Sequence, residues 1–299
     1  MAPGENTVTA VSGLRPGQEV DGVFACTRKD RLMTRTGSPY LALELRDRTG
    51  SVPARAFQGA DALAGRFERG DVVRVRGKVE RFRDELVLEV SDIARAGDDA
   101  VDPARFLPTA YRDVDELEGF LEHLANEVYD RAFARLVRGL LDDAALRAQW
   151  RRAPCSRAGH HAYLGGLLEH TVAVATLAQE TCQLHAGLNS DLLLTAALTH
   201  DLGRTREFTY GAELGLTDEG RLLGHLVIGE RMLSERSAGV LDDGRRLALL
   251  HCVLCHHGPS SAPGGRFASP EALALYRINA LDAAVKGALE HGLGSDSPI

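Results

Sequence analysis

The stretch that decides the fold of the larger part of this chain is residues 192–203, LLLTAALTHDLG. Leu192 to Leu198 is apolar apart from Thr195, and the run leads directly into the adjacent pair His200 and Asp201. We expect a buried helix here, which would place both polar side chains near the core, where an unpaired polar group is costly. A bound metal ion removes that cost, so the stretch predicts a metal site at the end of a core helix.

The sequence on both sides of this stretch has a helical pattern. Apolar residues recur at helical spacing in Asp113 to Val128, Arg131 to Leu141 and Asp143 to Arg151, and similar patterns continue to about Leu293. Nine of the 11 histidines lie between His160 and His257, which also indicates a metal site. We therefore predict an all-helical metal-binding domain over residues 113–299.

Further polar residues interrupt apolar helical runs in this domain. They are His170, His225, His256, His257 and Asp282. Taken singly, a histidine on an apolar helix is more often a hydrogen-bonded core residue than a ligand, but this many in one domain favour a metal centre. Imidazole and carboxylate ligands suit Zn²⁺, Mn²⁺, Fe²⁺ or Mg²⁺, and without a thiolate they do not single out zinc.

The N-terminal part has a different period. Residues 11–96 alternate apolar and polar side chains in five segments broken by Gly, Pro and Asp turns, which predicts short antiparallel strands. The predicted strands are Glu19 to Thr27, Pro39 to Arg46, Ser51 to Phe57, Asp71 to Arg81 and Glu85 to Ile93, with a helix at Ala60 to Phe67. This order is that of an OB-fold, although periodicity also permits another small barrel. A polar linker, residues 97–112, separates the two parts.

The predicted barrel is more basic than the rest of the chain. It carries 16 basic and 13 acidic residues, so a net charge of −7 for the chain leaves −10 on the remainder. An OB surface binds single strands through a basic groove and aromatic stacking platforms. The candidate nucleic-acid-binding residues are Tyr40, Arg74, Arg76, Lys78 and Phe82. For Phe57 we expect a place in the barrel core instead.

The order His170, His200-Asp201, Asp282 resembles the ligand order of the HD superfamily of metal-dependent phosphohydrolases. His225 and the pair His256-His257 resemble the extra histidines of members that hold two metals. Together with residues 159–162 (GHHA), residues 166–171 (GLLEHT) and the OB-like part, the chain is similar to the YhaM-type 3'-5' exoribonuclease family over about residues 17–293. The expected fold is an N-terminal all-β OB-fold barrel followed by a C-terminal all-α HD domain.

The resemblance implies a role for each matching residue. His170, His200, Asp201 and Asp282 would hold the first ion; His225 and His256 would hold the second, with Asp201 bridging and His257 a ligand or a donor behind the ligands. His160 and His161 would face the cleft as phosphate contacts or proton donors, although a capped, solvated loop fits them equally well. Arg204 stands where many HD enzymes have lysine; a guanidinium can hold a phosphate but does not readily donate a proton.

The implied activity is 3'-5' hydrolysis of single-stranded RNA, with single-stranded DNA as a second substrate left open by the motifs. Two divalent ions would activate a water, with Mn²⁺ favoured over Fe²⁺, Co²⁺, Zn²⁺ or Mg²⁺. Two alternatives remain: a phosphohydrolase of small nucleotides or cyclic dinucleotides, and a single-strand-binding protein with an inactive HD site. Gly258-Pro259-Ser260, in place of Gly-Tyr-Pro, argues against a cyclic-dinucleotide esterase.

The cysteines and the overall composition fit this interpretation. Five irregularly spaced cysteines give no disulfide framework, and no apolar run is long enough to span a bilayer, so we expect a cytoplasmic protein with no membrane partner. Cys252, Cys255 and His251 are predicted to be structural core residues. The sequence does not indicate an oligomeric state.

Overall fold

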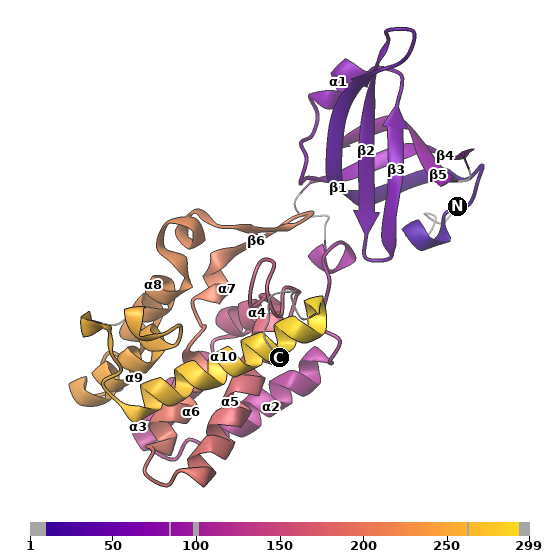
Figure 1. Ribbon diagram of the computed structural model, residues 1–299. Coiled ribbons are helices and arrows are strands. Elements are labelled where there is room, and N and C mark those ends of the chain that lie inside the picture. The colour runs from indigo at the N-terminus through magenta and orange to yellow at the C-terminus, as the bar shows by residue number, and fades with distance from the viewer. Residues whose placement is uncertain (1–9, 84, 98–101, 262, 293–299) are drawn as a thin grey trace. The chain divides into compact units, whose positions relative to one another are not determined.

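The computed structural model describes residues 10–83, 85–97, 102–261 and 263–292. The chain divides into two compact units, which are described here one at a time (Figure 1). The barrel unit is Met1–Pro108 together with Tyr210–Gly215, and the helical unit is Thr109–Thr209 together with Leu216–Ile299. No helix among the described residues is both long and apolar enough to cross a membrane.

Five strands close the barrel in the order β1-β2-β3-β5-β4. They are β1 (Glu19–Met33), β2 (Pro39–Asp47), β3 (Gly50–Ala56), β4 (Val72–Phe82) and β5 (Glu85–Arg95), with α1 (Ala60–Ala64) between β3 and β4. All neighbours are antiparallel except β3 and β5. The predicted OB-like barrel is confirmed. Strand β1 is longer than predicted because its pairing with β2 continues to Met33 opposite Pro39.

Alternation along the strands fills the barrel with apolar side chains. Val52, Ala54 and Ala56 of β3 are all buried, as are Val73, Val75 and Val79 of β4. At Gly77 of β4 a register shift brings the neighbouring strand unusually close, and a Cβ there would lie 2.2 Å from the Glu89 carbonyl oxygen. Only glycine fits at this crossing of β4 and β5.

The helical unit contains nine α-helices among the described residues, one of them short. Its helices are α2 (Val114–Asn126), α3 (Arg131–Leu141), α4 (Ala144–Arg152), α5 (Gly166–Leu184), α6 (Ser190–Thr199), α8 (Asp218–Ser237), α9 (Asp243–Cys255) and α10 (Pro270–His291), with the short α7 (Arg204–Glu207) besides. Asp113, Asp130 and Asp143 cap the first three helices by accepting backbone N–H bonds, which explains why each begins where the sequence pattern predicts.

Helix α5 lies at the centre of this unit and packs against α2, α4, α6 and α10. The core is formed largely by leucine, valine and alanine from these helices, and α6 is buried along most of its length. The end of α6 therefore brings His200 and Asp201 into the interior, as the stretch 192–203 predicts. The hairpin of β6 (Phe208–Tyr210) and β7 (Leu214–Leu216) was not predicted, because three-residue strands leave no clear alternation.

The predicted linker, residues 97–112, is only partly described, since 98–101 lie outside the described residues. Its described part includes a 3-10 turn, Pro103–Arg105, capped by the Asp102 side chain. Phe106 follows and is buried with Ala25 of the barrel. The barrel unit thus extends to Pro108, beyond the predicted end at residue 96.

The tight crossing at Gly77 makes a direct prediction about barrel stability. Gly77→Ala should destabilise the barrel by about 1–3 kcal/mol, because the added methyl forces β4 and β5 apart. Hydrogen–deuterium exchange of the full chain should show faster exchange in β1, β4 and β5 and unchanged exchange in α5 and α6. Gly65→Ala is the matched control, since a Cβ there meets nothing within 4 Å. Equal exchange in the two variants would contradict the prediction.

Candidate metal centre and nucleic-acid interface

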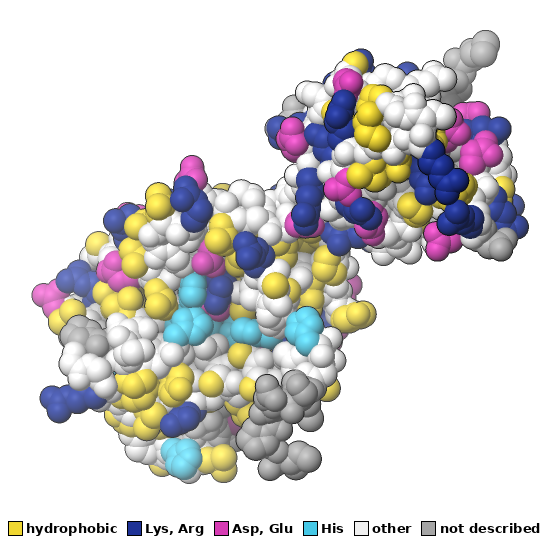
Figure 2. All heavy atoms as spheres, turned by 45° about the horizontal axis from the view of Figure 1, so that its top comes forward, with side chains coloured by type: hydrophobic (Ala, Val, Ile, Leu, Met, Phe, Trp, Pro, Cys, Tyr) yellow, Lys and Arg dark blue, Asp and Glu magenta, His cyan; other side chains and the backbone are white. Residues whose placement is uncertain are grey.

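Histidine side chains gather in a band on one face of the helical unit (Figure 2). The histidines of the centre beneath this band come from separate elements: His170 from α5, His200 from the end of α6, His225 from α8, and His256 from the C-cap of α9. His170, His200 and His256 are fully buried and lie below the surface that the figure shows. The core packing of these helices converges the rings on one carboxylate, that of Asp201, which is 3% exposed.

The first cluster consists of His170, His200 and Asp201. The Nε2 atoms of the two histidines lie 3.1 Å apart, and Oδ2 of Asp201 lies 3.8 and 3.7 Å from them. Both histidines are fully buried. Tetrahedral ligands at zinc-like bond lengths of about 2.0–2.1 Å lie roughly 3.4 Å apart, so these separations suit a shared ion.

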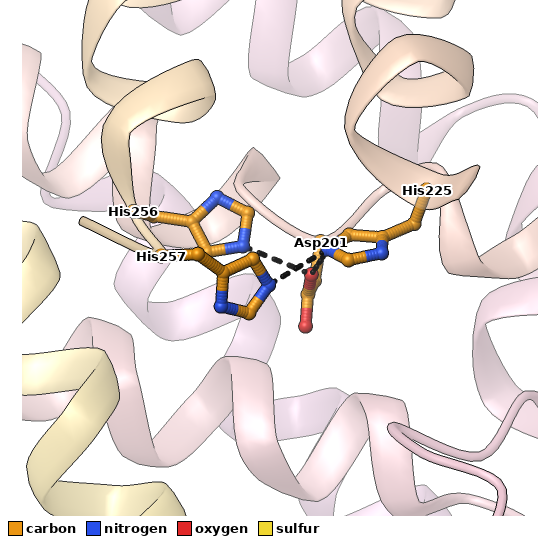
Figure 3. Close-up of side chains that lie close together, drawn as sticks. All are labelled: Asp201, His225, His256 and His257. Carbon is orange, nitrogen blue, oxygen red and sulfur yellow. Dashed lines mark hydrogen bonds and ion pairs between the residues drawn. The ribbon is translucent and has the colours of Figure 1, made fainter. Parts of the chain in front are cut away.

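The second cluster consists of Asp201, His225, His256 and His257 (Figure 3). Nε2 of His225 and Nε2 of His256 each lie 3.3 Å from Oδ1 of Asp201, and the Nε2 atoms of His225 and His257 lie 2.9 Å apart. Asp201 therefore presents one oxygen to each cluster: Oδ2 to the first and Oδ1 to the second.

Hydrogen bonds behind the rings fix which nitrogen faces the centre. Nδ1 of His200 lies 2.8 Å from the Ala197 carbonyl oxygen, and Nδ1 of His256 lies 2.6 Å from that of Val253. A carbonyl only accepts, so each Nδ1 carries the proton and donates it. The Nε2 lone pairs are left pointing into the clusters, which is the tautomer that a metal ligand requires.

In the first cluster, atoms with lone pairs therefore face one another, and a positive charge between them is needed to offset their repulsion. The lone pair of His200 Nε2 faces His170 Nε2, and Oδ1 of Asn279 lies 3.0 Å from the same His170 atom. A proton can supply the charge. Although burial lowers the pKa of His170, the neighbouring Cys155, Asp282 and Asp201 raise it well above its usual value. A divalent ion supplies the charge while contacting several of these atoms at once.

The second cluster shows the same need. Oδ1 of Asp201 and Nε2 of His256 are buried and, among the described residues, neither has a hydrogen-bond partner. Burial lowers the pKa of His200 and of His256, so both are neutral. Burial also tends to raise the pKa of Asp201, but the charge of Arg204 holds it well below its usual range. Neutral imidazoles around an anionic carboxylate form a donor set that fits divalent metal ions.

Asp282 lies on the other side of His170. Its Oδ2 accepts from His170 Nδ1 at 2.6 Å and lies 3.0 Å from Nε2 of His161. The four-residue set predicted for the first ion is thus divided, because Asp282 faces Nδ1 of His170 whereas His200 and Asp201 face Nε2. Burial alone would raise the pKa of Asp282, but the hydrogen bonds from His161 and His170 lower it by more. The net pKa is therefore below its usual value, and the carboxyl group is ionised.

His160 and His161 lie beside the first cluster. His161 is buried, and its ring contacts both Asp282 and the Tyr163 hydroxyl, which lies 2.8 Å from Nδ1. The His160 ring centroid lies 5.2 Å from that of His170. Burial and the nearby His170 lower the pKa of His160 to about 4, so this ring is neutral near pH 7 and suits a ligand better than a proton donor.

Arg204 is held by carboxylates rather than left open to a phosphate. Its Nε donates to Oδ2 of Asp201 at 2.8 Å and its Nη1 to Oε2 of Glu207 at 3.1 Å, and the side chain is 10% exposed. Glu207 also accepts from the backbone N–H of His225 at 3.3 Å. This chain of contacts connects the two clusters and fixes the Asp201 carboxylate between them.

The backbone following Asp201 is packed without room for a side chain. A Cβ on Gly203 would lie 2.1 Å from the carbonyl oxygen of His225 and 2.6 Å from the amide nitrogen of Gly229. Helices α7 and α8 therefore meet at backbone distance. This contact sets the separation of Asp201 from His225.

Sequence reasoning missed three polar residues at this centre. Glu207 stands three residues after Arg204, a spacing that predicts an ion pair on a helix. Asn279 interrupts the same apolar run as Asp282, and Cys155 precedes His160 by five residues. In contrast, Cys252 and Cys255 lie in the apolar core as predicted, and His251 has a structural contact, accepting from the Ala268 N–H at 2.9 Å.

The barrel carries an aromatic surface on β2, the end of β3 and the end of β4. The rings of Tyr40 and Phe57 stack with centroids 5.3 Å apart, and the Arg55 guanidinium lies 4.4 Å from the ring centroid of Phe82. The expectation that Phe57 lies in the core is wrong, because it is 45% exposed. Ala54 and Ala56 point inward, so alternation turns Arg55 and Phe57 outward. We call Tyr40, Arg55, Phe57 and Phe82 the stacking surface.

The predicted basic residues of β4 are surface side chains already paired with acids. Arg74 and Arg76 both contact Asp21, at 2.8 and 3.1 Å, and Lys78 lies 3.1 Å from Glu80. Each of the three cations is at least half exposed. Exposed pairs of this kind are weak, so a phosphate can replace the acid at little cost.

The fold and centre described above define a two-domain protein of the HD and OB-fold classes. The family model for the HD domain matches residues 167–284, and the model for an OB-fold nucleic acid binding domain matches residues 25–95. A model described as a putative helicase matches residues 102–191. The barrel aligns with the second OB-fold domain of replication protein A from Methanococcus maripaludis over 32% of this chain and all of that chain, at 19% identity and a TM-score of 0.24, a likeness too low to argue from.

Curated relatives confirm the resemblance noted from the sequence. The protein named 3'-5' exoribonuclease YhaM from Bacillus velezensis is 29% identical over 272 residues, covering 89% of this chain and 85% of the relative. The protein of the same name from Shouchella clausii is 28% identical over 283 residues, with 91% and 85% covered. The chain is a homologue of these proteins across both of its domains.

The unmet charge requirement predicts that metal stabilises the helical unit. Mn²⁺ or Zn²⁺ at about 100 times its dissociation constant should add roughly 2.7 kcal/mol and raise the unfolding temperature. The fluorescence of Trp150, which is buried in this unit, reports the transition. His256→Ala should remove most of the increase, whereas His185→Ala, at an exposed position, should keep it. An equal increase in both variants would place the ion elsewhere.

Proposed function

We propose that this chain is a metal-dependent 3'-5' exoribonuclease that acts on single-stranded RNA in the cytoplasm, with single-stranded DNA as a further substrate. The observation that carries the proposal is Asp201, whose two carboxylate oxygens face two separate histidine clusters. The names of the curated relatives support the activity and its polarity. Five free thiols agree with a reducing compartment.

His170, His200 and Asp201 would hold one ion, with Asp282 kept against His170 as the fourth residue of the predicted set. His225, His256 and His257 would hold the other, with Asp201 bridging. When bound, two divalent ions lower the pKa of a water and neutralise charge on the phosphodiester. Mn²⁺ is the ion expected from the sequence.

The protein groups around the centre position it rather than react. Arg204 and Glu207 keep the Asp201 carboxylate in its bridging orientation, and the backbone carbonyls of Ala197 and Val253 keep the histidine lone pairs inward. His160 and His161 border the first cluster; Asp282 and Tyr163 engage both ring nitrogens of His161, which leaves His160 to face the ions or a substrate phosphate. Arg204 therefore acts through Asp201 and takes no proton-donor role.

The acidic balance of the helical part fits this proposal. About −10 charges repel a polyanion, and two divalent ions add about +4 where the substrate phosphates would lie. Substrate binding to this unit is then strongly dependent on metal. The stacking surface and the basic side chains of β4 provide the barrel with a site that does not depend on metal.

The central test removes the bridging region. His200→Ala and Asp201→Ala should each reduce metal-dependent shortening of a 5'-labelled single-stranded RNA on the order of 10³-fold or more, because His200→Ala breaks the first cluster and Asp201→Ala breaks both. His185→Ala should leave the product ladder unchanged. Unaltered degradation by Asp201→Ala would disprove the site assignment.

The same assay separates the two alternatives. A panel of nucleotides and cyclic dinucleotides, run with each metal, should give little phosphate or linear dinucleotide compared with the RNA ladder. Turnover of the small molecules without a ladder would assign the small-nucleotide activity. Tight single-strand binding without turnover under any divalent ion would assign the inactive binding protein.

The stacking surface can be tested separately. Tyr40→Ala or Phe57→Ala should weaken binding of single-stranded RNA about 5- to 150-fold, since stacking contributes roughly 1–3 kcal/mol per base. Hydrolysis of bis(p-nitrophenyl) phosphate, which is too small to require the barrel, should stay unchanged. Tyr111→Ala, which replaces an aromatic residue 95% exposed in the helical unit, is the control for RNA binding. Loss of binding in the control as well would contradict a specific stacking role.

A further inference from the structure

Cys155 is a buried thiol next to the first cluster. It lies in the loop between α4 and α5, is fully buried, and is a free cysteine. Its backbone N–H donates to the carbonyl oxygen of His161 at 3.1 Å, which closes the loop and turns the side chain inward. Its Sγ lies 3.5 Å from Nε2 of His160 and 3.6 Å from Oδ2 of Asp201.

These separations are those of atoms that share an ion. Bond lengths of about 2.3 Å to sulfur and 2.0–2.1 Å to nitrogen, with tetrahedral angles, place the two ligand atoms roughly 3.6 Å apart. The ligand atoms of Cys155, His160 and His170 all lie within 4.8 Å of one another. The set shares His170 with the first cluster, so sulfur and nitrogen donors converge on the same region.

The surroundings of Cys155 differ from those of the core cysteines. Cys252 and Cys255 lie within the apolar core cluster of the helical unit, as small buried residues usually do. Cys255 also contacts an imidazole, that of His251 at 3.5 Å, but only Cys155 has a carboxylate beside its Sγ as well. That carboxylate belongs to Asp201, whose Oδ1 is buried without a hydrogen-bond partner among the described residues. The thiolate of a cysteine placed beside such groups is a metal ligand.

We propose that Cys155 and His160 supply donors to the ion held at His170, so that this half of the centre is a sulfur-containing site. A thiolate favours borderline ions, and the site takes Zn²⁺, Co²⁺ or Fe²⁺ in preference to Mn²⁺ or Mg²⁺. On binding, the thiol proton is released to solvent as the sulfur–metal bond forms. The inference rests on the metal centre of the proposed function and replaces the preference for Mn²⁺ expected from the sequence.

Cobalt provides a readout that does not depend on activity. The full chain, freed of metal with a chelator and kept anaerobic with a non-thiol reductant, is titrated with Co²⁺ and followed by absorption. A near-ultraviolet sulfur-to-cobalt charge-transfer band should grow to saturation together with the visible cobalt bands. Cys155→Ser should lose the charge-transfer band and bind Co²⁺ roughly tenfold more weakly. Its affinity for Mn²⁺ should stay within about twofold. Cys182→Ser, on the outer part of α5, is the matched control and should keep the band.

Each outcome decides the inference. Cobalt bound by the wild-type chain without a charge-transfer band, or a band that persists in Cys155→Ser, overturns it, and the wild-type result needs no variant to fold. A band without RNA degradation supports the sulfur ligand and removes the proposed function. Degradation without a band removes only the sulfur ligand. Absence of any cobalt uptake overturns the sulfur ligand, and the RNA assay with Mn²⁺ then decides the proposed function separately.

Discussion

The Asp201 carboxylate is buried between the two histidine clusters and Arg204, and the packing of the helical unit depends on this buried charge. Removing a carboxylate from water costs several kcal/mol unless hydrogen bonds and opposite charge compensate. Arg204 provides one compensation from the same turn of chain. The remaining oxygen, Oδ1, faces two histidines without a hydrogen bond among the described residues, and this leaves a demand that a cation meets. A hydrophobic core built mainly from leucine and alanine supplies the rigidity that keeps this arrangement in place.

Two kinds of sequence signal reached the correct structure. Period-two alternation located all five barrel strands, because each has one face in the barrel interior and one in solvent. The polar residues that interrupt apolar helical runs include His170, His200, Asp201, His225 and His256, and the structure brings their side chains close together. Both signals depend on contrast along the sequence. A polar residue stands out among apolar neighbours in a helix, and an apolar residue at every second position marks the buried face of a strand.

The errors arose where the environment is mixed. Phe57 was assigned to the core on its residue type, although its parity with Ala54 and Ala56 places it outside. Asn279 and Cys155 follow from the three-dimensional convergence of separate segments, and no local pattern marks a residue whose partner is more than forty positions away, as that of Cys155 is. Glu207 has a local signal in its spacing from Arg204, but that spacing predicts only an ion pair and not a place at the centre. The division of the first ligand set around the two nitrogens of His170 depends on ring orientation, which spacing cannot specify.

The backbone contact at Gly203 has a consequence for how this centre can vary. Side chains that bind a metal can be exchanged one at a time for others of similar reach, and the ion preference then drifts gradually. A crossing at which a carbonyl oxygen would lie 2.1 Å from any Cβ has no such gradual route, since every residue other than glycine must move one of the two chain segments. The distance between the two halves of the centre is therefore inherited as a fixed unit, while the ligands on either side of it remain free to diversify.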